Sequence, residues 1–185
     1  MVSLSRPRPW RLRQAVTKLD LAQSRGGFVM ASPPTTGLSL KARGLKHLAA
    51  REHSRVELER KLAPHAESAE ALAAVLDEFE QRGWLSVERF VASVVHRKAA
   101  RYGVARIRVE LAQHRLPEEA VHDAVAALKD TEMARAHAVW LRRFGGVADT
   151  PEARLKQMRF LAGRGFSSEV IRRIVDGRIS DDVDR

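Results

Sequence analysis

The sequence predicts an all-α protein, built of three tandem three-helix repeats that form an elongated, curved helical array. Leucine–alanine pairs recur at residues 62–63, 111–112 and 161–162, which are 49 and 50 residues apart. A glutamate stands seven residues after each alanine, and apolar pairs at helical spacing follow it. Aromatic residues make up only 5% of the chain, which favours helices over sheets. A period of about 50 residues with helical spacing inside it is typical of tandem helical units.

The repeat register also sets the expected domain boundaries. We expect repeats at residues 38–85, 86–130 and 131–179, and a short polar tail at 180–185. Residues 1–37 form a basic leader in which prolines and a Gly26–Gly27 pair interrupt every candidate helix. This leader is interpreted as a basic arm or as a disordered segment, and Met30 is an alternative start of translation.

In the first repeat, helices are expected to begin after Ser39, Ser54 and Ser68. Serine is favoured at these positions because its hydroxyl accepts a hydrogen bond from a free N–H of the first helical turn. Glu57 lies three residues after Ser54, which is the spacing of a capping box. The third helix is expected to end at Gly83.

The second repeat opens with a helix that carries apolar side chains on one face, at Val91, Val95, Ala99 and Tyr102. Gly103 is expected to end this helix in the left-handed conformation, which favours glycine. A second helix then restarts the apolar stripe with Ile107 and Leu111. The polar side is basic, with Arg89, Arg97 and Arg101 predicted to form one row.

The third repeat is expected to begin near Thr131. Its first helix is predicted to bury one stripe of side chains, at Met133, His137, Trp140 and Leu141. Gly145 and Gly146 should stop that helix. A second helix should run from Thr150 to Ala162, and Ser167 or Ser168 should cap the last one.

The net charge of +10 is unevenly distributed. Residues 38–87 hold eight groups of each sign, whereas residues 89–115 hold seven basic groups against one acid and residues 135–173 hold nine against three. Clusters of this kind indicate an acidic partner, either a nucleic acid or an acidic protein surface.

Motifs for catalysis are missing from the sequence. It contains neither a phosphate-binding glycine loop nor a cysteine, and no two histidines lie three or four residues apart. We expect each histidine to be exposed or half-buried, and we expect no enzymatic activity, cofactor or metal. No apolar run reaches the length of about 20 residues that crosses a membrane, so a cytoplasmic protein is predicted. We also expect it to be a monomer.

Two stretches carry a resemblance to a known family. RYGVARIRVEL at residues 101–111 and QMRFLAGRGFSSEVI at residues 157–171 resemble hallmark motifs of the RecX family. The resemblance covers residues 38–177 and has both motifs in order. Gly163 departs from the family, where that position is often basic, and the long basic leader is not a family feature.

The resemblance implies three three-helix repeats and a regulator of the RecA recombinase. Such a protein would bind RecA–DNA filaments and limit filament extension, ATP hydrolysis and strand exchange in recombination and DNA repair. We expect Tyr102 to be a structural side chain beneath Arg101. The predicted partner-binding residues are Arg97, Arg101, Arg106, Arg108, Arg142, Arg143, Lys156, Arg159, Arg164 and Arg172.

The competing hypothesis is a helix-turn-helix DNA-binding protein that acts directly on nucleic acid. Residues 54–83 have the rhythm of such a motif, but the first repeat is neutral and its helices carry several acids. Direct contact with single- or double-stranded DNA stays open beside filament binding.

Overall fold

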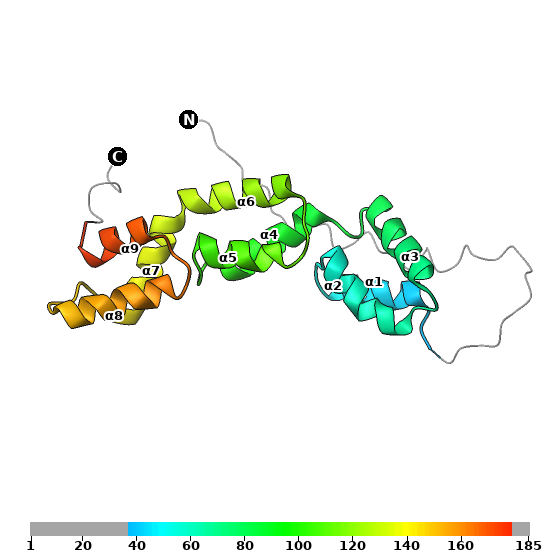
Figure 1. Cartoon of the computed structure of the whole chain (residues 1–185), viewed down its shortest axis with the longest axis horizontal. Helices are drawn as coiled ribbons and strands as arrows, with labels where there is room; N and C mark the ends of the chain where they lie inside the picture. Colours follow the sequence, from blue (N-terminus) through cyan, green and yellow to red (C-terminus); the bar gives the residue numbers. More distant parts are fainter. Residues whose placement is uncertain (1–36, 179–185) are drawn as a thin grey trace, which may run out of the picture. The chain divides into compact units, whose positions relative to one another are not determined.

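A computed structural model describes residues 37–178, and within that range every regular element is a helix (Figure 1). The all-α fold class is therefore confirmed. Apart from Gly37, the predicted leader lies outside the described residues, and so does the predicted tail.

The first repeat contains α1 (Leu40–Ala50), α2 (Arg55–Leu62), the short 3-10 helix η2 (Ala63–His65) and α3 (Ala69–Gln81). The three predicted serine caps are confirmed: each hydroxyl accepts a backbone N–H from the first turn of its helix. Gly83, with φ of +67°, follows α3. The helices enclose one apolar cluster, formed by Leu58, Leu62, Leu72, Leu76, Phe79 and Leu85.

The second repeat contains α4 (Val87–Lys98), α5 (Val104–Ala112) and α6 (Glu118–Asp130). The predicted apolar side chains pack into its core, together with Ile107 and Leu111 of α5. The helix ends earlier than predicted, however, because α4 stops at Lys98 and Gly103 is the residue before α5. Tyr102 is half-buried against the same cluster, with the Arg101 guanidinium 5.8 Å from its ring centroid, as expected for a structural side chain.

The third repeat contains α7 (Glu132–Phe144), α8 (Pro151–Ala162) and α9 (Ser168–Val175). Gly145 ends α7 in the left-handed conformation, and Thr150 and Ser167 cap the next two helices, as predicted. Inside the repeat, the indole N–H of Trp140 donates to Gln157 Oε1 at 2.9 Å.

The prediction that Leu141 faces the core is wrong, because its side chain is 48% exposed. The buried face of α7 is instead formed by Glu132, Ala136, Val139 and Trp140. The buried face extends from Trp140 toward Val139, so Leu141, which is turned by about 100° to the other side of Trp140, lies at the exposed edge.

The repeat register has a clear structural meaning. Leu62, Leu111 and Leu161 are each 0% exposed and lie at the end of the middle helix of their repeat. The three glutamates of the register each occupy the first turn of a third helix, α3, α6 or α9. A carboxylate there interacts favourably with the helix dipole. The domain boundaries at 85/86 and 130/131 stay a prediction, which the three separate apolar clusters support.

Candidate partner-binding site

The two sequence motifs meet in the structure, where the α4–α5 turn of the second repeat lies against the α8–α9 turn of the third. The Gly103 N–H donates to the carbonyl oxygen of Arg164 at 2.9 Å. The Ala105 N–H donates to the carbonyl oxygen of Gly165 at 3.1 Å. Backbone hydrogen bonds therefore join the two repeats. The only side-chain requirement of these bonds is that Gly103 and Gly165 have none, because a Cβ would not fit.

Gly103 is not left-handed, and that prediction was wrong: its φ is −78°. Glycine is needed there because a Cβ would lie 2.2 Å from the Gly165 carbonyl oxygen. The left-handed glycine of the pair is Gly165, with φ of +79°, and a Cβ on it would lie 2.6 Å from the Arg106 nitrogen. The prediction that position 103 requires glycine was correct, but the reason is close packing and not a left-handed backbone.

Glu132 performs the capping that Gly103, having no side chain, cannot perform. Its Oε1 accepts the Val104 N–H at 2.9 Å, so a residue of α7 caps the start of α5. The Glu132 side chain is only 5% exposed. The sequence does not indicate this contact, because an acid in a first turn is normally explained by the dipole of its own helix.

Arg135 of α7 stabilises the same contact between the second and third repeats. Its guanidinium donates to the carbonyl oxygens of Ala99, Tyr102 and Leu128 at 2.8–2.9 Å, and to Thr131 Oγ1 at 3.1 Å. Burial lowers the pKa of Arg135, and the nearby Glu132 carboxylate acts in the opposite direction. An arginine stays charged at neutral pH even so. One of the nine basic groups counted at residues 135–173 is thus internal.

A surface hollow of about 270 Å³ opens beside this joint. Four of the ten predicted partner-binding residues line it, namely Arg101, Arg142, Arg143 and Arg164. Its other lining residues are Ala100, Tyr102, Val139 and Phe160. The structure therefore brings arginines from both motifs, and from α7, to one hollow whose lining also includes apolar and aromatic side chains.

Three of the four guanidiniums of the hollow lie over aromatic rings: Arg101 over Tyr102, Arg143 over Phe144 and Arg164 over Phe160. The Arg164 Cζ is 3.7 Å from the centroid of Phe160, a stacking distance. Phe160 in turn makes an edge contact with Phe144, at 5.1 Å between centroids. Stacking restricts the arginine and leaves the edge of its fork available for an anion.

The other six predicted residues are exposed but do not line the hollow: Arg97, Arg106, Arg108, Lys156, Arg159 and Arg172. Arg172 donates to the Ser168 carbonyl oxygen at 3.4 Å. Arg89, the first member of the predicted row, is neutralised because it pairs with Glu52 at 3.0 Å. Sequence spacing could not predict that pairing, since the partners are in different repeats.

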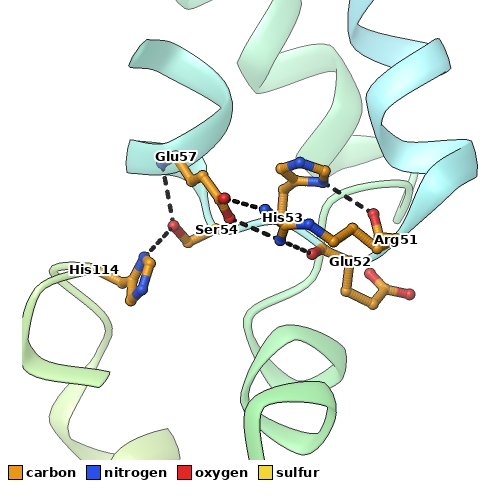
Figure 2. Close-up of polar contacts among 6 residues, drawn as sticks. All are labelled: Arg51, Glu52, His53, Ser54, Glu57 and His114. Atoms are coloured by element: carbon orange, nitrogen blue, oxygen red, sulfur yellow. Dashed lines mark hydrogen bonds and ion pairs between the residues drawn. The ribbon is translucent and has the colours of Figure 1, made fainter. Parts of the chain in front are cut away.

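The joint between the first and second repeats is different in kind (Figure 2). Ser54 Oγ accepts the Glu57 N–H at 3.1 Å and lies 2.7 Å from His114 Nδ1. The Glu57 carboxylate pairs with Arg51, so it does not complete the capping box as the sequence predicts. The joint rests on side chains, one of which is a histidine.

His53 at this joint is buried, contrary to the expectation for histidines, with 2% of its side chain exposed. Its Nδ1 lies 2.9 Å from the Arg51 carbonyl oxygen. Burial is the largest effect on both His53 and His114, and it lowers the pKa of each. Both rings are therefore neutral at pH 7.

Within residues 37–178, no group of three acidic or histidine side chains could hold a metal ion. In the same range, no helix is long and apolar enough to span a membrane.

Fold and site together define a helical tandem-repeat protein with a basic candidate binding surface. The model of the third three-helix domain of RecX matches residues 130–175. "Regulatory protein RecX" of Ralstonia nicotianae is 54% identical over 78% of this chain and 91% of its own length. The same-named protein of Leptothrix cholodnii is 56% identical over 78% and 90%. The chain belongs to the RecX family of regulatory proteins.

Solved structures agree on the fold. A crystal structure of regulatory protein RecX aligns with a TM-score of 0.63 at 23% identity, covering 74% of this chain and 71% of the other. RecX from Lactobacillus salivarius aligns with the same score at 16% identity, covering 75% and 93%.

Proposed function

We propose that this protein regulates the RecA recombinase in the cytoplasm by binding RecA–DNA filaments. Binding would limit filament extension, ATP hydrolysis and strand exchange. Family membership and the RecX motifs support this function. The observation that carries it is the hollow at the joint of the second and third repeats, where four arginines converge without a carboxylate partner among the described residues.

The basic residues outside the hollow extend the same interaction. Exposed cations from α4, α5 and α8 would contact acidic groups on neighbouring subunits, so that one molecule bridges them and hinders their cycling. Arginine suits such contacts because its planar fork pairs bidentately with carboxylate or phosphate. The first repeat contributes less, since four of its eight basic groups are paired with acids of the same repeat.

Direct DNA binding is the competing function, and one observation weighs against it. In the region with helix-turn-helix rhythm, the guanidinium of Arg55 pairs with both Asp77 and Glu80 of α3. A recognition surface for phosphates should carry free cations and few acids. Those acids lie on the helix that would have to approach DNA.

Co-sedimentation tests the proposal. The protein is mixed with RecA–single-stranded DNA filaments, or with the same DNA alone, at matched physiological salt, and ATP hydrolysis is followed in parallel. We expect the protein to pellet with filaments and to slow hydrolysis, with much weaker retention on naked DNA. Equal retention on naked DNA would favour the competing function, and no retention on filaments would refute the proposed one.

A further inference from the structure

We propose that the arginine hollow binds an acidic protein segment through one apolar side chain seated on its floor and flanking carboxylates paired with its arginines. This inference names the kind of partner surface and rests on the proposed function. It concerns the hollow lined by Arg101, Arg142, Arg143 and Arg164.

The four arginines of the hollow carry uncompensated charge. None of the four guanidiniums forms an ion pair or a side-chain hydrogen bond with any residue in the range 37–178. Elsewhere in the chain, arginines do find acids, as Arg55 does with Asp77 at 2.6 Å. Like charges gathered at one hollow repel, so the cluster is stabilised when an anion from outside enters it.

Apolar side chains also contribute to the lining of the hollow. Ala100 and Val139 supply them, in addition to the Phe160 ring over which Arg164 lies. The volume of about 270 Å³ is roughly nine times that of a water molecule in the liquid, which is room for a large side chain. A buried apolar anchor surrounded by polar contacts is the usual arrangement of a binding hot spot.

The aromatic rings of the hollow favour a protein segment over a nucleic-acid strand. A strand bound without sequence preference usually stacks its bases on open aromatic faces. Here the rings already hold cations: Arg164 lies over Phe160, and Lys98 and Arg101 lie over Tyr102. The arginines also converge on one hollow, whereas phosphates follow one another along a strand. Carboxylates beside one apolar side chain fit this arrangement better.

Fluorescence anisotropy tests the inference with a defined probe. The probe is a fluorescein-labelled peptide in which one phenylalanine is flanked on both sides by pairs of glutamates. Two control peptides replace the phenylalanine with glycine or the glutamates with glutamine. We expect the full-length protein to bind the probe, and each control peptide to bind at least about tenfold more weakly.

Two matched variants locate the binding. Arg142→Gln with Arg143→Gln removes two exposed charges at the hollow, and Arg97→Gln with Arg108→Gln removes two exposed charges away from it. Circular dichroism verifies that both stay folded. The first pair should weaken probe binding about tenfold, and the second should change it less than about threefold. Equal loss in both, or equal binding of the glycine control peptide, would overturn the inference.

The outcomes separate the inference from the proposed function. If filaments are bound and the probe is not, the hollow does not recognise such a segment and the inference fails alone. If the probe binds at the hollow while filaments are not retained, the proposed function fails and the inference stands. If a labelled oligothymidylate displaces the probe and binds more tightly at the same salt, the hollow takes phosphates and the inference is wrong.

Discussion

The backbone N–H of Gly103 donates to the carbonyl oxygen of Arg164 at 2.9 Å, which fastens the second repeat to the third. The same two turns supply Arg101 and Arg164 to the hollow. The spacing of these arginines therefore depends on a contact that only a residue without a side chain allows.

Replacing Gly103 by alanine should loosen this joint. The added Cβ would lie 2.2 Å from the Gly165 carbonyl oxygen and 2.4 Å from the Phe166 nitrogen, both backbone atoms that cannot rotate away. We expect the free energy of unfolding to fall by about 1–3 kcal/mol, measured by urea denaturation.

Gly146→Ala is the matched control, because its Cβ would meet nothing within 4 Å. It should change the free energy of unfolding by less than about 0.5 kcal/mol. Similar losses for the two alanine variants would show that close packing is not the reason for glycine at position 103.

The Glu132 cap gives a second prediction. Glu132→Ala removes the acceptor of the Val104 N–H and leaves that donor buried. We expect a loss of about 1–3 kcal/mol in the free energy of unfolding. Glu132→Gln keeps an acceptor oxygen and should lose clearly less, so equal losses would argue against the cap and for a role of the charge alone.

The leucines of the repeat register give a third prediction. Leu62→Ala, Leu111→Ala and Leu161→Ala should each lower the free energy of unfolding by about 2–5 kcal/mol, since all three side chains are fully buried. Leu155→Ala, at a side chain 44% exposed on α8, is the control and should cost less than about 1 kcal/mol. Small changes at all three register positions would mean that they are not equivalent core sites.

His53 and His114 predict that the free energy of unfolding depends on pH. Burial lowers the pKa of His53 and of His114 in the folded state below the value of about 6.5 in an unfolded chain. The unfolded chain therefore takes up protons first as the pH falls. Their contribution to stability is complete above about pH 6.5 and is lost as the pH falls from there toward the lower folded-state pKa values.

Urea denaturation at several pH values between about 5 and 8 measures this loss. His114→Asn removes one titrating ring and keeps an acceptor for the Ser54 hydroxyl, so the variant should lose less stability over that range than the parent does. If the pH dependence of the variant equals that of the parent, His114 does not contribute to the loss of stability at low pH.

Much of the fold is local, and so could be predicted from the sequence. Ser54 caps its helix and Leu111 is buried because capping and helical periodicity depend on neighbours within a few residues. The error at Leu141 came from choosing between two adjacent positions of one helix, which periodicity resolves poorly.

The candidate site could be predicted only in part, because pairing is decided across repeats. Spacing identified basic rows, yet it could not show that Arg89 is paired with Glu52 while Arg142 has no such partner among the described residues. Glu132 and Arg135 were missed for the same reason: their partners Val104, Tyr102 and Ala99 lie 28 to 36 residues away. A buried charge in a first helical turn has no signature of its own in the sequence.

The last prediction divides the ten predicted partner-binding residues by position. If the hollow is the centre of the filament contact, Arg142→Gln with Arg143→Gln should weaken binding to RecA filaments by about thirtyfold or more, because central, desolvated contacts exceed about 2 kcal/mol. Arg97→Gln with Arg108→Gln removes the same charge away from the hollow, where the two contacts together contribute about 1 kcal/mol or less. Co-sedimentation over a salt series, with inhibition of ATP hydrolysis as the second readout, distinguishes the two pairs. If both pairs weaken filament binding equally, and both effects disappear at high salt, the protein is attracted by overall charge. If Arg142→Gln with Arg143→Gln does not weaken binding, the contact lies on another face.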